Sequence, residues 1–291
     1  MKDLRQTEEW GRFLESCGWV VKKLTIKSHR PRRNISPLRS DPPRRSSGLN
    51  PPFRVRPFCY VFIKKIPLTP VSIMKMQRFE GELDWGEFNK LKRKYKVIYS
   101  ISEPVKKSMK WKKIDSYLPT KTLVIDLKKT KGELWKDLSE NARRMIKKEN
   151  GVVIKKVREE RFLREWKKAN KIWSWEFNKL KKLVRAFENR ADLLVSKNGK
   201  KWLSGLVILR SADMVFYFQT WTNEEGRGLG AHYKLVWEAI LSAKAEGLTY
   251  FDFEGIDDSR SPRKSWVGFS EFKKKFGGEE ISFPGCFGRW L

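Results

Sequence analysis

Four carboxylates lie close together in the sequence at a place where an enzyme could use them. Asp252, Glu254, Asp257 and Asp258 lie within or just after the apolar run at residues 250–253, which has the pattern of a strand. A carboxylate at the end of a strand can act as a general base or bind a substrate ammonium group. Acids in loops are also commonly solvated, so both interpretations stay open. Asp252 and Glu254 are the candidates for substrate binding.

A glycine-rich link, Glu-Gly-Arg-Gly-Leu-Gly at residues 225–230, precedes an expected helix. Glycines at a helix N-terminus let backbone amides approach a phosphate, where the helix dipole favours negative charge. Arg227, Gly228 and Gly230 are therefore candidates for a loop that binds a phosphate or an acyl donor. CoA-dependent GNAT enzymes carry Arg or Gln at the first position of this pattern, whereas Glu225 would repel a pyrophosphate. A flexible glycine-rich turn is the alternative.

The histidines and cysteines predict neither a nucleophilic triad nor a metal site. The two histidines are His29 and His232, and the three cysteines, Cys17, Cys59 and Cys286, are far apart. This spacing fits no zinc motif and no disulfide framework. The cysteines suit a reducing compartment, where they would be small buried residues.

The charge balance is strongly basic. Lys and Arg number 64 against 34 Asp and Glu, which gives a formal net charge of +30. Such a field attracts polyanions, so nucleic acid, an anionic membrane surface or a phosphate-bearing substrate is an expected partner. A solvated lysine-rich surface is the alternative. The longest uncharged apolar runs are shorter than the ~18 residues of a spanning helix, and the charged start is unlike a signal peptide, so a cytoplasmic location is expected.

In the first part of the chain, a basic segment poor in hydrophobic residues separates two segments with regular hydrophobic patterns. Residues 27–57 are rich in Pro, Arg and Ser with almost nothing to bury, and we expect a disordered basic loop there. Around it, hydrophobic periodicity predicts a helix over 6–24 that ends near Gly18, a strand over 58–63, a helix over 85–94 and a strand over 97–102.

The second part predicts two helices, an antiparallel meander, one helix and one strand, which is the order of the GNAT fold. Thr130 and Glu133 have the spacing of a capping box, and the helix that they open has apolar residues on one face through Ile146. We expect strands 215–221 and 250–253 to be adjacent and parallel. The other predicted elements are strands at 123–127, 193–196 and 203–209 and a helix at 231–246.

Five segments, in the same order, resemble the FemABX family of aminoacyltransferases. They are Gln6-x3-Trp10 followed by Gly18-Trp19, PTKTLVIDL at 119–127, NARRMIKKENGV at 141–152, WEAILSAKAEGLTYFDFEGI at 237–256 and GFSEFKKKFGGEEISFPG at 268–285.

The resemblance implies an α/β (α+β) fold of two GNAT-like domains. The first domain, at 1–118, would be degenerate and would carry the basic loop. The second domain would span 119–278, and the tail at 279–291 would return to the first domain. Two departures stand out: the basic loop replaces the early hairpin of the family, and Glu254 occupies a position where glycine is usual.

The function implied by the resemblance is transfer of an amino acid from aminoacyl-tRNA to the peptide stem of a peptidoglycan precursor, in cell-wall bridge formation. The precursor would be lipid-linked or UDP-linked, so both substrates would carry phosphates, in agreement with the basic charge. The enzyme would use no cofactor besides aminoacyl-tRNA as co-substrate. It would be a monomer, cytoplasmic, with peripheral contact to the inner face of the membrane.

The resemblance also assigns roles to residues. Phe272 and Lys273 match the closing motif beside the reacting ester, where an ammonium ion would stabilise the oxyanion of the tetrahedral intermediate. If the motif is a strand or turn, the two lysines that follow point elsewhere. Arg143 and Lys147 match the basic helix and would hold precursor phosphates, unless they belong to a solvated helix face.

Two other functions remain open from the sequence alone. A CoA-dependent N-acyltransferase using acetyl-CoA is favoured by Gly228 and Gly230 and opposed by Glu225. A catalytically inactive, basic RNA-binding module is favoured by the net charge and by the degenerate first domain.

Overall fold

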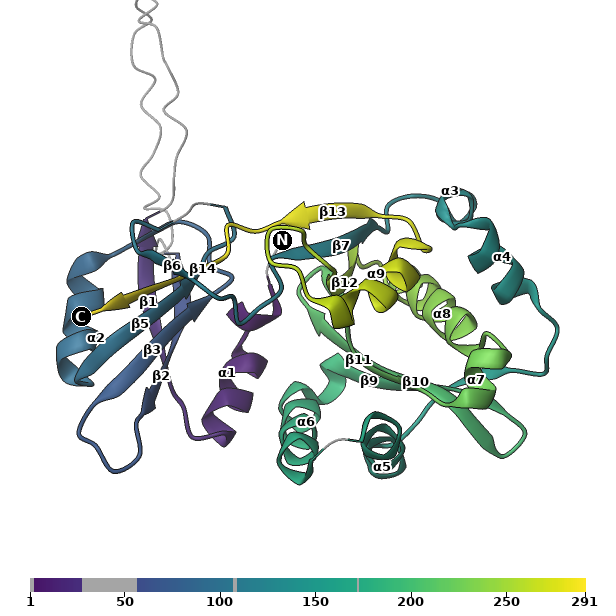
Figure 1. Cartoon of the computed structure of the whole chain (residues 1–291), viewed down its shortest axis with the longest axis horizontal. Helices are drawn as coiled ribbons and strands as arrows, with labels where there is room; N and C mark the ends of the chain where they lie inside the picture. The colour runs from purple at the N-terminus through teal and green to yellow at the C-terminus, as the bar shows by residue number, and fades with distance from the viewer. Residues whose placement is uncertain (1–2, 28–56, 107–108, 172) are drawn as a thin grey trace, which may run out of the picture.

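The computed structural model of the 291-residue chain describes residues 3–27, 57–106, 109–171 and 173–291 (Figure 1). The chain forms two units, each built on a seven-stranded mixed sheet. The disordered loop was expected over residues 27–57. Of these, residues 28–56 lie outside the described part of the chain, and only the two end residues can be compared. Lys27, at one end, is the last residue of a strand.

The sheet of the first unit has one parallel pair, β3 and β5, which are connected through α2 (Trp85–Lys94). All its other strand pairs are antiparallel. In spatial order its strands are β4 (Glu82–Leu83), β1 (Val20–Lys27), β2 (Phe58–Lys65), β3 (Ser72–Gln77), β5 (Val97–Glu103), β14 (Cys286–Trp290) and β6 (Lys112–Ile114).

The start of the chain corrects two expectations. The predicted helix over 6–24 is only α1 (Glu8–Ser16), after a short 3-10 helix η1 (Leu4–Gln6), and its last part is strand β1. Gly18 adopts φ +78°, a left-handed conformation that ends the helix. β1 and β2 pair antiparallel, so the strands of the early hairpin are present, and the expectation that a basic loop replaces them was wrong.

The second unit repeats this arrangement with more helices. In spatial order its strands are β13 (Glu279–Ser282), β7 (Lys121–Asp126), β12 (Tyr250–Gly255), β11 (Met214–Thr222), β10 (Lys201–Ser211), β9 (Ala191–Asn198) and β8 (Val153–Lys156). Its helices are α3 (Lys131–Asp137), α4 (Glu140–Lys147), α5 (Glu159–Asn170), α6 (Ser174–Phe187), α7 (Glu224–Gly228), α8 (Ala231–Ala245) and α9 (Val267–Lys274), with 3-10 turns η2 (Glu188–Arg190) and η3 (Lys264–Trp266).

The helix predicted from Thr130 through Ile146 is two helices. Thr130 begins α3 with the predicted capping box. Leu138 is extended, and the Ser139 hydroxyl accepts from the Ala142 amide at 3.2 Å, which begins α4. The sequence signal for this second start is the serine itself, which is a preferred N-cap residue.

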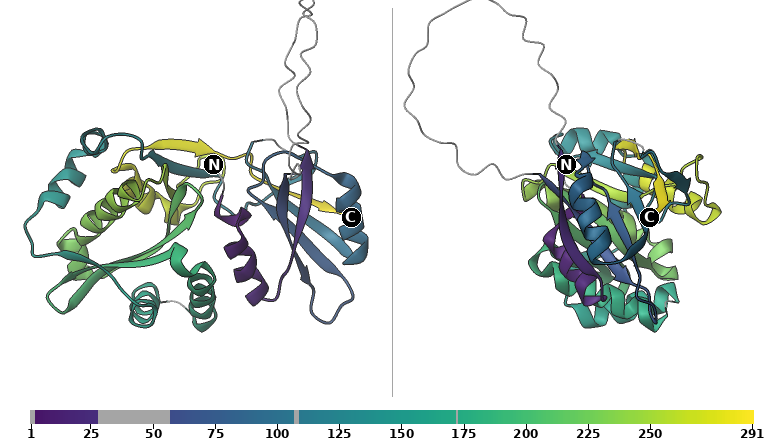
Figure 2. Two further views of the ribbon diagram at one scale, coloured as in Figure 1. Left: turned by 180° about the vertical axis from the view of Figure 1, so that it is seen from behind. Right: turned by 90° about the vertical axis from the view of Figure 1, so that its left-hand side faces the viewer.

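Helices cover both faces of the second sheet (Figure 1). α8 packs on one face, while α5 and α6 pack on the other, beside α1 of the first unit; Figure 2 shows the same arrangement from behind. One buried apolar cluster includes Trp10 of α1, Phe62 of β2 and Phe162 of α5, so the two units share a core.

The end of the chain contributes to both sheets. β13 pairs with β7 in the second unit, and β14 then pairs between β5 and β6 in the first (Figure 1). The predicted domain boundary falls between Ile114, the end of β6, and Lys121, the start of β7. Within the described residues, no helix combines the length and apolar character needed to cross a bilayer.

The predicted parallel pairing of strands 215–221 and 250–253 is confirmed, because β11 and β12 are parallel neighbours. Their pairing extends only from Met214 opposite Tyr250 to Phe216 opposite Asp252. Beyond that point the two strands diverge, and their backbone groups no longer pair with each other. With this topology, the predicted GNAT-like α/β fold is confirmed, and the divergence is where a site can form.

Candidate active site

Lys273 lies beside the divergence of β11 and β12. Its Nζ donates to the backbone oxygen of Gly255, the last residue of β12, at 2.6 Å. The same ammonium nitrogen lies 5.4 Å from the ring centre of Tyr217 on β11 and 4.8 Å from that of Phe269 on α9. Aromatic faces attract a cation. Lys273 is thus fixed at the mouth of the divergence, with its side chain buried.

Burial lowers the pKa of Lys273 to about 8, against the opposing effect of the carboxylates of Glu254 and Asp252. A lysine with such a pKa is mostly charged at pH 7 and can also release a proton near neutral pH. It can therefore stabilise an oxyanion and donate a proton in the same reaction.

The neighbouring lysines face other partners. Lys274 Nζ pairs with Glu280 at 2.9 Å, and Lys275 Nζ donates to the hydroxyl of Tyr233 at 3.2 Å. The expectation of a strand or turn here was wrong, because the motif forms helix α9. Successive residues of a helix nevertheless point in different directions, so only Lys273 lies at the divergence.

Phe272 belongs to an aromatic wall rather than to the polar centre. Its ring centre lies 5.3 Å from that of His232, 4.9 Å from Tyr233 and 5.3 Å from Phe276. These contacts fix α9 against the start of α8. The predicted role of Phe272 beside the ester stays a prediction, and the geometry makes it a support for Lys273.

A row of hydrogen-bonded side chains, which the sequence analysis did not predict, runs from the divergence into the second unit. The Tyr217 hydroxyl and His232 Nε2 are 2.8 Å apart, His232 Nδ1 and Ser204 Oγ are 3.3 Å apart, and Ser204 and Ser196 share a bond of 2.7 Å. Burial lowers the pKa of His232 to about 4, so its ring is neutral at pH 7. This row orients the Tyr217 hydroxyl without adding charge.

The carboxylates of Asp252 and Glu254 are engaged by the protein. Asp252 accepts from the Thr122 hydroxyl and, at 2.7 Å, from the Glu254 amide. Burial and the nearby Glu254 raise the pKa of Asp252 to about 7. The carboxylate of Glu254 accepts a hydrogen bond from each terminal nitrogen of Arg5, at 2.8 Å in both cases. Burial would raise the pKa of Glu254, but the guanidinium of Arg5 outweighs it and lowers that pKa.

The two loop acids are also paired. Asp258 accepts from the Thr120 hydroxyl at 2.6 Å and from Arg260, and these bonds hold the pKa of its carboxyl well below the usual range. Asp257 accepts from the Arg263 amide at 3.3 Å. Their partners are structural, so Asp252 remains the carboxylate best placed near the divergence.

The hydrogen bond and the aromatic contacts of Lys273 Nζ involve neither the basic helix, with Arg143 and Lys147, nor the glycine-rich link. Both residues belong to α4 and contact α3: Arg143 donates to the backbone oxygen of Lys136 at 3.1 Å, and Lys147 Nζ lies 5.5 Å from the ring centre of Trp135. Their phosphate-binding role stays a prediction.

Backbone amides of the glycine-rich link are already used. The Leu229 amide donates to Glu225 and the Gly230 amide to Arg227, while the Arg227 guanidinium donates to Thr222. Gly228 is the last residue of α7, and Gly230, with φ +64°, precedes α8. Pairing of these amides within the turn disfavours a pyrophosphate site here.

An aromatic cavity of about 280 Å³ lies between the two units. Burial, and then the charge of Lys179, lower the pKa of Lys75 to about 8, so this lysine lacks full compensation. Sequence reasoning missed it because its residues come from four distant segments. The lining residues are Trp10, Phe13, Leu14, Lys75, Trp166, Trp175, Glu176, Lys179, Leu180, Leu183, Phe218 and Gln219.

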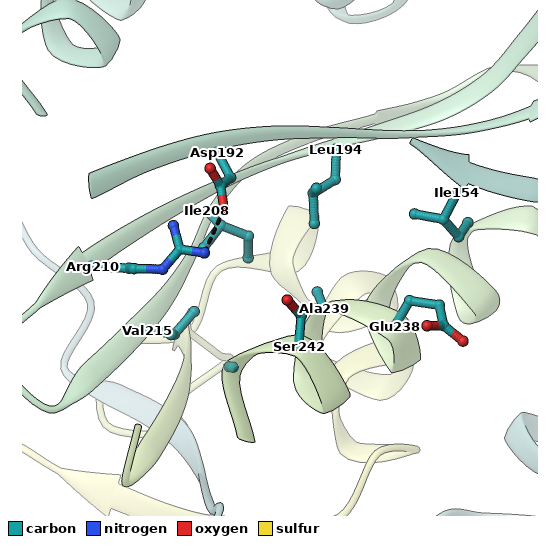
Figure 3. A pocket seen from close by; sticks show the side chains of 10 residues that line it. Ile154, Asp192, Leu194, Ile208, Arg210, Val215, Glu238, Ala239 and Ser242 are labelled. Carbon is teal, nitrogen blue, oxygen red and sulfur yellow. Dashed lines mark hydrogen bonds and ion pairs between the residues drawn. The ribbon is translucent and has the colours of Figure 1, made fainter. Parts of the chain in front are cut away.

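A second cavity, of about 210 Å³, lies between α8 and the sheet of the second unit (Figure 3). Its one guanidinium, Arg210, is paired with Asp192 and, at 2.8 Å, with Glu246. With its charge compensated, Arg210 offers little to an anion, and none of the predicted site residues lines this cavity.

Solved structures share the fold of this chain. A crystal structure of FemX superposes with a TM-score of 0.77 at 14% identity, over 99% of this chain and 92% of that one. The structure of L-PGS from Bacillus licheniformis gives a TM-score of 0.52 at 11% identity, over 78% of this chain and 80% of that one. No curated protein sequence matches the chain significantly. The chain therefore shares its two-unit fold with FemX.

A sequence comparison shows similarity to one family over the last part of the chain. The FemAB family model matches residues 167–289, which include β11, β12, α9 and Lys273. The predicted resemblance to FemABX transferases is thereby confirmed over these residues.

Proposed function

We propose that the protein transfers an amino acid from aminoacyl-tRNA to the peptide stem of a peptidoglycan precursor. The observation that carries the proposal is the buried ammonium of Lys273 beside the divergence of β11 and β12. The FemAB match over this region supports it, and the net charge of +30 suits two phosphate-bearing substrates. The reaction would take place in the cytoplasm, at the inner face of the membrane if the precursor is lipid-linked.

The chemistry needs one new bond and one broken bond. The amine of the precursor attacks the ester carbonyl, a C–N bond forms, and the carbonyl oxygen becomes an oxyanion. Lys273 stabilises that oxyanion, and the oriented Tyr217 hydroxyl is a second donor at the same opening. The intermediate then breaks the C–O bond to the tRNA ribose, whose oxygen takes up the proton lost by the nitrogen.

The interunit cavity is the proposed binding site of the precursor. Phe218 and Gln219 line it, directly after Tyr217 on β11, so the cavity and the reacting centre lie on opposite faces of one strand. The opening beyond Phe216 would connect the two faces. Lys75 and Lys179 would bind the precursor phosphates, and the aromatic walls would contact its less polar parts.

Product identification tests the function. The protein is incubated with charged tRNA and either UDP-linked or lipid-linked precursor, and the precursor is weighed by mass spectrometry. An added aminoacyl residue is the expected result. Parallel incubations with acetyl-CoA test the CoA-dependent alternative, for which the paired amides around Gly230 give little support. If tRNA binds but no precursor gains mass, the protein is the RNA-binding module.

A further inference from the structure

Glu254 has an unusual backbone for its residue type. Its φ is +59°, in the left-handed region that glycine adopts freely and residues with a Cβ disfavour. A glycine at this position would relieve the strain. The side chain of Glu254 must therefore make contacts that offset the cost of its backbone conformation.

Those contacts join the two units. Both terminal nitrogens of Arg5 donate hydrogen bonds to the carboxylate of Glu254. Both side chains are largely buried, since 5% of the Arg5 side chain and 14% of the Glu254 side chain are exposed. The Arg5 guanidinium also lies 5.3 Å from the ring of Trp10. Such a bidentate pair has a fixed geometry, which holds η1 of the first unit against β12 of the second.

The same carboxylate affects the reacting centre. Gly255, the next residue, is the acceptor of the Lys273 ammonium, and the negative charge of Glu254 favours that ammonium against burial. The other charged groups around this carboxylate are Asp3, the N-cap of η1, Arg5 within η1, Arg78 directly after β3 and Asp252 from its own strand. Among them, Arg5 makes the direct bonds to Glu254.

We propose that Glu254 is a positioning residue, which clasps the N-terminal segment of the first unit onto the second and holds Lys273 there as an ammonium ion. The first unit, whose described strands β3 and β5 stay paired, thereby completes the reacting centre. The consequence for catalysis rests on the proposed function, whereas the clasp and the charge of Lys273 are properties of the protein alone.

The charge effect is tested by competitive labelling of the full chain. Trace acetic anhydride is added over a pH series, and fragment spectra report the labelling of Lys273 and of Lys274. In Glu254→Gln the apparent pKa of Lys273 should fall by about 1, a tenfold change in the ratio of charged to neutral amine. Lys274, which pairs with Glu280, is the matched control and should not change. An unchanged pKa of Lys273 in the folded variant overturns the proposal.

The clasp is tested by hydrogen exchange on the same proteins. Amides of residues 3–7 should exchange at least tenfold faster in Glu254→Gln, while those of α2, distant from Arg5, keep their rates. Because Glu254→Gln leaves Arg5 buried without its partner, a double variant, Arg5→Met with Glu254→Gly, removes both charges and preserves folding. It should show the same faster exchange, whereas the pKa of Lys273 should fall less than in Glu254→Gln, because a positive and a negative charge are removed together; wild-type exchange in the double variant overturns the proposal.

These measurements need no substrate, so they separate this proposal from the proposed function. If labelling and exchange change as expected and the wild-type protein transfers no amino acid, the function fails and the clasp stands. If transfer occurs and Glu254→Gln leaves both measurements unchanged, the clasp fails and the function stands.

Discussion

The two units share one plan but differ at the strand pair where chemistry can occur. In the first unit, β3 and β5 stay paired from Ser72 to Gln77 along the full length of β3. In the second, β11 and β12 separate after three pairs. The closed pair keeps its backbone groups paired, whereas the open pair leaves backbone groups of the two strands unpaired with each other, and Lys273 and Tyr217 lie beside it. An active centre in this fold therefore depends on early separation of the strands.

The polar residues beside the closed pair, β3 and β5, and those beside the open pair, β11 and β12, also differ in how fully they are bound by the protein. At the end of the closed pair, Gln77 donates to Glu103 at 2.8 Å, and Glu103 also accepts from the Leu118 amide at 2.8 Å, so the carboxylate of Glu103 is bound by the protein itself. At the open pair, the direct contacts that Lys273 Nζ makes with described residues are a backbone oxygen and aromatic faces. A cation with this incomplete set of partners can interact with a substrate oxyanion.

The largest expected effect concerns tRNA. Binding through several phosphates should weaken by about 10³-fold or more between 50 and 200 mM salt, because neutralised phosphates release counterions. Filter binding or fluorescence titration with uncharged tRNA measures it. An affinity independent of salt would mean that the net charge of +30 plays no part in recognition.

Substitutions in the interunit cavity should weaken binding of the precursor without slowing the chemical step. Lys75→Met and Lys179→Met should each raise KM for the precursor about tenfold with little change in kcat, because each removes a charged contact to a phosphate. Lys182, whose Nζ donates to the backbone oxygen of Ser16, gives the matched control in Lys182→Met. Equal KM values in all three variants would place the precursor outside this cavity.

A matched pair of core substitutions sharpens the comparison between the units. Phe88 in α2 and Phe253 in β12 are both fully buried, and Phe253 packs 5.3 Å from Tyr217. Phe88→Leu and Phe253→Leu should each lower the free energy of unfolding by about 1–2 kcal/mol, as urea denaturation would show. Only Phe253→Leu should slow transfer by the folded protein. If Phe88→Leu slows it equally, the first unit contributes directly to the chemistry.

Much of the second unit could be predicted from the sequence, because its signals are local. The Thr130 capping box and the apolar runs of β11 and β12 each depend on neighbours in the sequence. The break at Ser139 was missed because the apolar face continues through both helices. β1 was assigned to a helix because α1 is amphipathic and Gly18 gives only an approximate end.

The site could be predicted only in part. The resemblance pointed to Lys273, but its burial and its contact with Gly255 depend on tertiary packing. Arg5 and Glu254 are 249 positions apart, and no local pattern indicates that they pair. A glutamate at a position where glycine is usual was the one available signal.

The central claim is that Lys273 at the open strand pair carries out acyl transfer. Its most direct test is single-turnover transfer from labelled aminoacyl-tRNA to the precursor by Lys273→Met, with Lys274→Met as the control. Loss of the oxyanion donor should lower the rate about 10²–10³-fold and leave substrate affinity nearly unchanged. The control should retain the wild-type rate within about twofold, because Lys274 pairs with Glu280 on the surface. Equal, small effects of both substitutions would contradict the account.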